Sequence, residues 1–306
     1  MKYYIGIDGG GTKTDCILVD ESNNLLSFVK GGSLNILTSG TIESAKTILG
    51  LINVSLSNQG VNLNELVCIG ISAAGAGRQE DSGKLENRLQ TLLPRSIFVK
   101  VITDAEAALE GAFDGNPGCI LISGTGSIIF GKDDQGSIHR CGGFGKTLGD
   151  EGSGYMLGKK GLRAALREFD GRGDKTLITF LLKDKYQVES AEDIINSVYN
   201  KDLDIAGIAP LVLASAGNND VIALKIIDAE TEELMNLIYC MIKKLKKDNI
   251  EICFSGKLIS TVNVFSTILR KKISESGKSI KIIEPVFPPA LGAVFIAKKN
   301  MGGISR

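Results

Sequence analysis

The sequence predicts an α/β protein of two similarly built domains, each a mixed sheet flanked by helices, with a cleft between them. The chain has 306 residues, and single hydrophobic cores stop growing at roughly 250–300 residues. In the first half, apolar strand-like runs alternate with amphipathic helical stretches. A group of three short strands with a small loop of glycine and hydroxyl residues occurs twice, more than a hundred residues apart.

The first strand group lies at the N-terminus. Its strands are predicted at 3–7, 15–19 and 25–29. Two helix–strand pairs follow, because apolar residues first recur at helical spacing and then form continuous runs typical of buried parallel strands. The helices are predicted at 42–52 and 85–92, and the strands at 66–71 and 97–102. The first half therefore has the order β-β-β-α-β-α-β.

The second strand group begins a larger and more helical domain. Its strands are predicted at 119–122, 127–130 and 137–141. Long apolar-periodic stretches edged by lysine predict helices at 155–167, 191–198, 205–215 and 220–247. The pattern ends with a strand at 250–254, a helix around 264–269, a strand at 280–283 and a terminal helix from 288. We expect domains at 1–115 and 116–287, with the C-terminal helix, about 288–306, joining the first.

The charge balance excludes one class of partner. Lys plus Arg and Asp plus Glu both total 35, so the chain lacks the basic excess of a nucleic-acid-binding protein. The start MKYY runs directly into a strand pattern, and no apolar run approaches the ~20 residues that cross a bilayer. We therefore expect a cytoplasmic protein without a membrane partner. Six scattered cysteines without a C-x-x-C pair are typical of reduced core thiols rather than a metal site.

The stretch Asp8-Gly9-Gly10-Gly11-Thr12-Lys13-Thr14 predicts a phosphate-binding loop. The Walker and dinucleotide-binding patterns do not occur in the sequence. Three glycines let backbone N–H groups and hydroxyls approach phosphate oxygens, and Asp8 stands where it can hold Mg²⁺ through water. The alternative is a plain hairpin turn, although such turns usually need only one or two glycines. The second loop has Ser123 in place of Asp8, which fits a single metal ion because a second carboxylate would repel the phosphates.

Three groups of residues carry a resemblance to one family. They are the first glycine loop, Ser123-Gly124-Thr125-Gly126-Ser127, and Gly142-Gly143-Phe144-Gly145 followed by Leu148-Gly149-Asp150-Glu151-Gly152-Ser153-Gly154-Tyr155. On these motifs the sequence resembles the N-acetylglucosamine kinase branch of the BadF/BadG/BcrA/BcrD ATPase family, with weaker matches at 255–257 and 289–293. The resemblance implies an actin-like, hexokinase-type ATPase fold in which two related domains close around ATP and a sugar.

Asp104 is the candidate catalytic base. It follows a buried strand and begins a helix, so we expect its carboxylate to face a cleft rather than the core. A kinase that acts on a sugar hydroxyl needs one carboxylate to orient the hydroxyl and take its proton. The alternative role is a helix N-cap, and the residues alone do not decide between the two. The resemblance favours the base, and Glu106 is interpreted as a solvated acid of the first helical turn.

The resemblance also implies the remaining contacts. Asn35 would contact the sugar, Gly143 and Gly145 would offer backbone groups to its acetamido region, and Asp150 would accept hydrogen bonds from ring hydroxyls. The alternatives are an ordinary turn residue for Asn35 and a helix cap for Asp150. ATP would be bound by Gly9, Gly10, Gly11, Thr12, Lys13, Thr14, Gly124, Thr125, Gly126, Ser127, Gly217 and Gly256, and Mg²⁺ by Asp8.

The implied activity is phosphorylation of the C6 hydroxyl of an amino sugar, with ATP and Mg²⁺ as cofactors and a homodimer as the assembly. N-acetylglucosamine is the leading substrate. Phe144 stands where these kinases commonly have tryptophan, so N-acetylmuramic acid and glucosamine stay open as substrates. Two other functions stay open: an ATPase that activates a dehydratase through an iron–sulfur cluster, and a non-catalytic sugar-sensing regulator. The single histidine, His139, is given no role.

Overall fold

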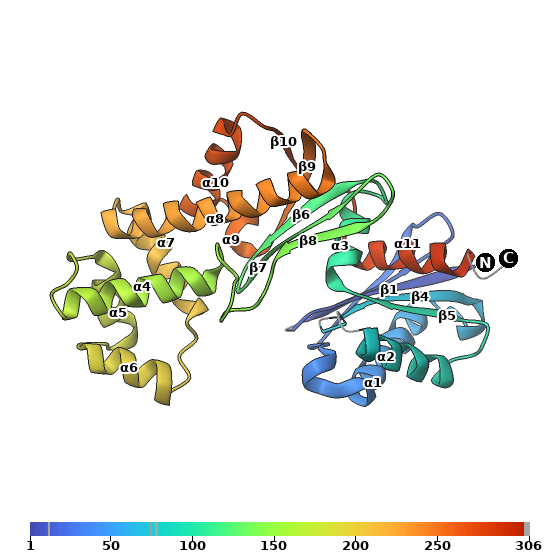
Figure 1. Cartoon of the computed structure of the whole chain (residues 1–306). Helices are drawn as coiled ribbons and strands as arrows, with labels where there is room; N and C mark the ends of the chain where they lie inside the picture. The colour runs from blue at the N-terminus through green and yellow to red at the C-terminus, as the bar shows by residue number, and fades with distance from the viewer. Residues whose placement is uncertain (12, 74, 77–78, 303–306) are drawn as a thin grey trace. The chain divides into compact units, whose positions relative to one another are not determined.

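The computed structural model describes residues 1–11, 13–73, 75–76 and 79–302. The chain forms two compact units, Met1–Gly118 with Glu284–Arg306, and Cys119–Ile283. Each unit contains one five-stranded mixed sheet with its helices (Figure 1). The sequence-based domain boundaries, after residues 115 and 287, stay a prediction.

The sheet of the first unit has the strand order β3-β2-β1-β4-β5. The three N-terminal strands are antiparallel neighbours, and the last two run parallel to β1. The strands are β1 (Tyr3–Gly9), β2 (Thr14–Val19), β3 (Leu25–Gly31), β4 (Leu66–Ala73) and β5 (Phe98–Ile102). The helices are α1 (Ile36–Ser57), the 3₁₀ turn η1 (Leu63–Glu65), α2 (Gln79–Leu92), α3 (Asp104–Ala112) and α11 (Pro289–Gly302).

The C-terminal helix α11 packs on the first sheet and on α3 (Figure 1). Gly6 and Gly70 allow this close approach, because a Cβ on either residue would lie 2.0 Å from a carbonyl oxygen of α11. A separate core that includes Ile5, Ile48 and Leu85 joins the sheet to α1 and α2. Since β1, β4 and β5 are parallel, their carboxyl ends share one edge of the sheet, where such folds place ligands.

The sheet of the second unit has the order β10-β9-β6-β7-β8, with β6, β9 and β10 parallel and β7 antiparallel to β8. The strands are β6 (Gly118–Ser123), β7 (Ser127–Lys132), β8 (Ile138–Gly142), β9 (Asn249–Ser255) and β10 (Ser279–Ile283). The helices are α4 (Gly154–Phe169), α5 (Leu177–Tyr186), α6 (Ala191–Asn200), the 3₁₀ turn η2 (Ala206–Ile208), α7 (Ala209–Gly217), α8 (Val221–Leu245), α9 (Lys257–Ser260) and α10 (Val264–Glu275).

Helix α8 organises the core of the second unit. It spans 25 residues and packs against β7, β8, α4, α7 and α10 (Figure 1). Gly131 in β7 allows the helix to approach the sheet, because a Cβ there would lie 2.6 Å from the sulfur of Met241. The buried face of α8 is apolar except at Glu230 and Thr231. These two residues are therefore candidates for specific polar contacts.

The predicted strands of both groups are confirmed, and the helices differ in several places: α2 begins at Gln79 rather than at 85, and the short α9 was not predicted. Helix α1 begins at Ile36 rather than at 42, because Asn35 caps an additional first turn that ends in a kink at Gly40, where φ is 71°. The predicted helix 205–215 divides into η2 and α7. Helix α5 was not predicted, because its apolar residues form a run without clear helical spacing.

One apolar helix pair meets the length and composition expected of a membrane span. Within the described residues no single helix is long and apolar enough to cross a membrane, and the pair Ala206–Gly217 and Val221–Leu245 does so only together, bent by 117°. Both segments supply residues to the core of the second unit, including Val212, Ile227 and Leu234.

Candidate functional site

Asp8 lies at the carboxyl end of β1, beside Asp15 of β2 and Ser72 of β4. The Ser72 hydroxyl donates a hydrogen bond of 2.7 Å to Oδ1 of Asp8. Burial raises the pKa of Asp8 above its usual 3.8; the bond from Ser72 lowers it, and the carboxylates of Asp15 and Asp104 raise it further. Because these acids crowd one edge of the sheet, a cation is electrostatically favoured there.

The first glycine loop closes as a tight turn. Gly10 N–H donates to the carbonyl of Lys13 at 2.9 Å, and the carbonyl of Gly10 accepts from Leu34 N–H at 2.9 Å. Gly9 is required by packing, since a Cβ there would lie 2.4 Å from Cδ2 of Leu34. Gly11 has no atom within 4 Å of the position of a Cβ. The backbone at Gly11 is therefore open to the approach of a ligand.

The polar residues of this loop have different environments. The hydroxyl of Thr14 is buried and donates to the carbonyl of Gly32 at 2.6 Å, so this hydroxyl supports the fold. Lys13 is exposed and pairs with Asp15 at 2.8 Å. Thr12, which was also predicted to contact ATP, lies outside the described residues.

Asp104 is the first residue of α3, directly after Thr103. Thr103 is the N-cap, so the capping alternative for Asp104 does not apply. The Asp104 side chain is exposed, and its Oδ1 accepts from Ala105 N–H at 2.9 Å. The interpretation of Glu106 as a solvated acid is wrong: it is partly buried and completes a capping box, accepting from the N–H and hydroxyl of Thr103 at 2.8 Å each.

Asn35 caps helix α1 in the first unit. Its Oδ1 accepts a hydrogen bond of 3.0 Å from Leu37 N–H, so the residue is more than an ordinary turn residue. The backbone of Gly75, where φ is +86°, lies close by: a Cβ there would be 3.2 Å from Oδ1 of Asn35. The cap fixes the orientation of the Asn35 amide, and its sugar contact stays a prediction.

The second glycine loop, 123–127, joins β6 to β7. Gly124 N–H donates to the carbonyl of Gly126 at 2.9 Å, and the carbonyl of Gly124 accepts from Gly154 N–H at 2.7 Å. Thr125 is exposed, whereas Ser127 is buried. Ser127 donates from its hydroxyl to the carbonyl of Glu151 at 2.6 Å. Of the two hydroxyls in this loop that were predicted to contact ATP, only that of Thr125 is free to face solvent.

Asp150 lies between the second glycine loop and the 142–145 segment. Its Oδ1 accepts from Gly145 N–H at 3.1 Å, and its carboxylate lies against Gly126. Asp150 has a left-handed backbone, with φ of 62°, and Ser153 is the N-cap of α4, so Asp150 is not the helix cap. Gly143 is held against Ile128, where a Cβ would meet a side-chain atom at 2.3 Å. The structure therefore brings Gly126, Gly145 and Asp150 together.

The two remaining glycines of the predicted ATP site differ. Gly256 has a φ of +88°, and a Cβ there would lie 2.3 Å from the carbonyl oxygen of Ser123. Gly256 therefore lies against the start of the second glycine loop. Gly217 is the last residue of α7, with no atom within 4 Å of a Cβ position. Among the described residues, no contact places Gly217 beside the other candidates.

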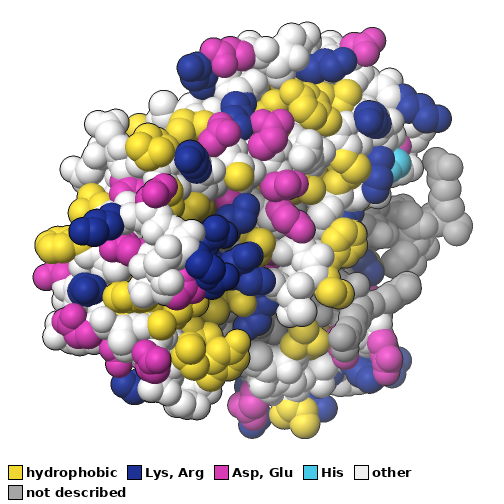
Figure 2. Space-filling model, turned by 60° about the vertical axis from the view of Figure 1, so that its left-hand side comes forward, with side chains coloured by type: hydrophobic (Ala, Val, Ile, Leu, Met, Phe, Trp, Pro, Cys, Tyr) yellow, Lys and Arg dark blue, Asp and Glu magenta, His cyan; other side chains and the backbone are white. Residues whose placement is uncertain are grey.

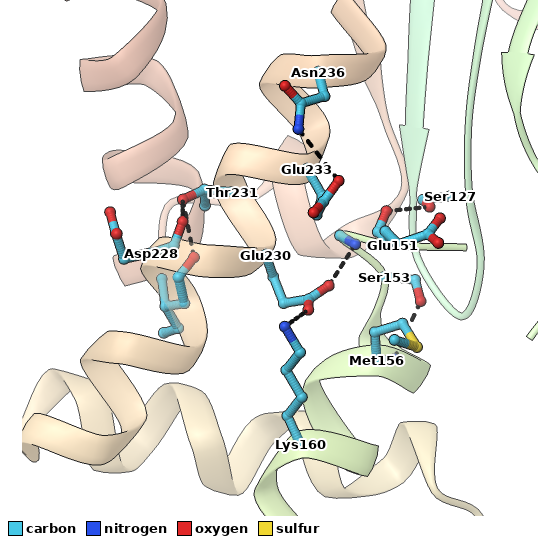
Figure 3. A network of polar contacts seen from close by, with 12 residues as sticks. Ser127, Glu151, Ser153, Met156, Lys160, Asp228, Glu230, Thr231, Glu233 and Asn236 are labelled. Carbon is cyan, nitrogen blue, oxygen red and sulfur yellow. Dashed lines mark hydrogen bonds and ion pairs between the residues drawn. The ribbon is translucent and has the colours of Figure 1, made fainter. Parts of the chain in front are cut away.

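Sequence reasoning missed a buried network around Gly152 (Figure 3). Gly152 N–H donates to Oε2 of Glu230 at 2.6 Å, and the carbonyl of Gly152 accepts from the hydroxyl of Ser123 at 2.7 Å. Lys160 forms an ion pair with the other oxygen of Glu230. The only sequence signal was a glutamate on the apolar face of a long helix.

The cysteines are free thiols in the structure. Burial raises the pKa of Cys16, Cys68 and Cys119 to about 12. Cys141 and Cys240 approach to 2.6 Å between their sulfurs. Within the described residues no group of three or more His, Cys, Asp or Glu side chains is arranged to hold a metal ion.

Charges are mixed on the surface seen in Figure 2, where basic, acidic and apolar side chains alternate. Several Lys and Arg side chains gather near the middle of that face, next to acidic groups. This distribution agrees with the equal totals of basic and acidic residues.

Two five-stranded mixed sheets, each with a glycine loop after its first strand, make up a fold that is shared with a solved structure over nearly the whole chain. The crystal structure of a candidate N-acetylglucosamine kinase from Chromobacterium violaceum matches with a TM-score of 0.76 at 24% identity, covering 97% of this chain and 99% of that one. The predicted fold class is therefore confirmed. The model of the BadF/BadG/BcrA/BcrD ATPase family matches residues 5–297. The chain belongs to this family.

Two relatives are similar over nearly their whole length. The N-acetylmuramic acid/N-acetylglucosamine kinase of Clostridium acetobutylicum is 35% identical over 305 residues, which cover 98% of this chain and 99% of the relative. The N-acetyl-D-glucosamine kinase of Dictyostelium discoideum is 31% identical over 314 residues, which cover 97% and 98%.

Proposed function

We propose that this protein is an ATP-dependent amino-sugar kinase that phosphorylates the C6 hydroxyl of its substrate. The observation that carries the proposal is the 35% identity, over 98% of the chain, to a kinase named for N-acetylmuramic acid and N-acetylglucosamine. N-acetylglucosamine is the leading substrate. The exposed Phe144 leaves N-acetylmuramic acid and glucosamine as alternatives, because it occupies the position where a larger ring is expected in this branch.

Asp104 is the proposed base. Its carboxylate is exposed at the start of α3, and its backbone position is fixed by the Thr103–Glu106 capping box. One carboxylate oxygen accepts from Ala105 N–H, and the other can accept the sugar hydroxyl. The Asp104 carboxylate would orient the hydroxyl oxygen and take its proton as that oxygen bonds to phosphorus and ADP leaves.

Sugar contacts are assigned to Asn35 and to three residues of the 143–150 segment. Asn35 in the first unit has its orientation set by the α1 cap. Asp150, Gly143 and Gly145 in the second unit lie on one continuous segment, with Asp150 tied to Gly145 N–H. Asn35 and Asp150 are half-buried, and a bound sugar would cover them further. A substrate without the matching hydroxyl would then leave the acceptor unpaired, which discriminates strongly against it.

Phosphate binding is assigned to the backbone of the two glycine loops, at Gly9, Gly10 and Gly11 and at Gly124, Thr125 and Gly126, together with Lys13. Adenosine is assigned to Gly217 and Gly256. Asp8 fits a Mg²⁺ site, because its Oδ2 accepts no hydrogen bond from the described residues. Its pKa is raised first by burial and then by the neighbouring acids Asp15 and Asp104, so a cation would relieve the repulsion between these carboxylates. Bound Mg²⁺ would neutralise phosphate charge during transfer.

A reducing, cytoplasmic compartment is supported by the free state of the cysteines. We also propose that the protein is a homodimer. Light scattering coupled to size exclusion tests it, and a monomer at micromolar concentration would overturn it.

The experiment that tests the function is a coupled ADP-release assay with separate sugars. N-acetylglucosamine, N-acetylmuramic acid, glucosamine, N-acetylmannosamine and glucose are each added with ATP and Mg²⁺. We expect sugar-dependent ADP release with at least one of the first three, and phosphate on C6 of the product by NMR. ADP release that no sugar stimulates would refute the proposal.

A further inference from the structure

Glu230 is a buried carboxylate on α8. Its side chain is 1% exposed, and among the described residues it is the only acidic residue that is fully buried. An ionised carboxylate away from water is unfavourable unless it is paired and hydrogen-bonded. Glu230 has both kinds of partner, since it accepts from Gly152 N–H and pairs with Lys160 of α4 (Figure 3).

The backbone around Gly152 is held from two sides. Glu230 holds its N–H, while Ser123 and Ser127 donate to the carbonyls of Gly152 and Glu151 at 2.7 and 2.6 Å. Gly152 has a φ of +80°, and a Cβ there would lie 2.4 Å from Cδ2 of Leu234. The loop therefore packs directly on α8 and has little freedom to shift.

This loop links the two parts of the proposed site in the second unit. Asp150, the proposed sugar contact, lies two residues before Gly152 and has a left-handed backbone. Ser123 and Ser127 bound the loop assigned to phosphate. A displacement of Gly152 would therefore move Asp150 and the ends of the phosphate loop together.

We propose that Glu230 and Lys160 are positioning residues, whose ion pair sets the place of the 150–153 loop and thereby aligns Asp150 for the sugar. This proposal rests on the proposed kinase function. A well-packed apolar pair would stabilise a core as well as a buried ion pair does, so the pair is better explained by the position it specifies. Neither residue is expected to touch the substrate.

The side chains of Lys160 and Glu230 differ in exposure, so removing one or the other should have different consequences. The Lys160 side chain is 34% exposed and lines a cavity of about 300 Å³ with Arg163, Arg167 and Lys225. Without Glu230, Lys160 can be solvated. Without Lys160, the Glu230 carboxylate stays buried and unpaired. Arg163 lines the same cavity but makes no ion pair within the described part of the chain, so its replacement is a matched control.

The test compares Lys160→Met, Glu230→Gln, the double variant and Arg163→Met. We expect Lys160→Met to raise KM for the sugar about tenfold and KM for ATP less than about twofold. The double variant should recover most of the sugar KM, because the amide oxygen that Glu230→Gln introduces can accept from Gly152 N–H. A purely structural role would lower the active fraction and leave KM for the sugar unchanged. That result, or an equal rise in Arg163→Met, would overturn the proposal.

Amide hydrogen exchange provides a readout without activity. In Lys160→Met the amides of residues 150–154 should exchange at least about tenfold faster than in the parent, with Arg163→Met unchanged. Equal rates in all proteins would refute the positioning role even if the kinase is active. If the parent phosphorylates no sugar, the proposed function fails, and the exchange rates still decide whether the pair holds the loop. Glu230→Gln keeps the test available should Lys160→Met not fold.

Discussion

The carboxylate of Asp150 lies against Gly126, so that a Cβ on Gly126 would be 2.8 Å from Oδ2 of Asp150. This contact joins the proposed sugar residue to the second glycine loop. Because the nearest atom is the end of a side chain, a methyl group at 126 would displace the carboxylate rather than disrupt the backbone. The contact is therefore suited to testing the role of Asp150 without changing Asp150 itself.

We predict that Gly126→Ala raises KM for the sugar about tenfold with little loss of stability, because Asp150 must rotate away. Gly124→Ala is the matched control in the same loop, since no atom lies within 4 Å of its Cβ position. That variant should affect KM for ATP and leave KM for the sugar near the parent value. Steady-state kinetics with each substrate varied separately measure both effects. The same sugar KM in both variants would contradict the role of Asp150.

We predict that Asp104→Asn lowers kcat by about 10²–10⁴-fold while sugar and ATP still bind, because amide nitrogen and oxygen cannot take the hydroxyl proton. The capping box of Thr103 and Glu106 should keep α3 intact in this variant. Calorimetric titration with sugar checks binding, and the ADP-release assay checks turnover. Turnover near that of the parent would refute the assignment of the base.

We predict that Asp8→Ala raises the Mg²⁺ concentration needed for half-maximal activity several-fold, because Asp8 is the proposed carboxylate for the ion. Glu43→Ala is the control: its carboxylate pairs with Lys46 on the surface of the same unit and is not assigned to Mg²⁺. Titration of Mg²⁺ at fixed total ATP measures the requirement. The same metal dependence in the parent and Asp8→Ala would remove Asp8 from the metal site.

Asp8 also predicts a pH effect on stability. Its pKa is raised above 3.8, mainly by burial, so the folded protein holds the proton more tightly than the unfolded chain. The contribution of Asp8 to the free energy of unfolding should therefore fall as pH rises from 3.8 through the raised pKa and stay constant above it. Asp8→Asn has no carboxyl group to titrate at this position, and its amide oxygen can still accept from Ser72. The free energy of unfolding of the variant, relative to that of the parent, should therefore rise across that pH window. Urea unfolding at a series of pH values measures the difference, and a difference independent of pH would contradict the prediction.

The sequence predicted what depends on local pattern. Strand runs, glycine loops and the Asp104 position are visible because apolar spacing and small residues are read within a few neighbouring positions. The partners of these residues are distant: Ser72 lies 64 residues from Asp8, and Glu230 lies 78 residues from Gly152. Such pairs arise only when the chain folds. The misinterpretation of Glu106 has the same origin, because Thr103 and Asp104 are both good caps and only the backbone shows which one begins α3.

The thiols give a last prediction, which separates the kinase from an iron–sulfur protein. Burial raises the pKa of Cys16, Cys68, Cys119 and Cys141 to about 12, so at pH 8 only about one thiol in 10⁴ at each position is ionised. Since the thiolate is the reactive form, iodoacetamide should leave these four unmodified in the folded, reduced protein. The partly exposed Cys240 is the matched comparison within the chain, and urea-unfolded protein should be modified at all six cysteines. Peptide mass spectrometry measures each site. Rapid modification of Cys119 in the folded state, or a brown purified protein, would contradict the interpretation of the cysteines as core thiols and restore the cluster-dependent alternative.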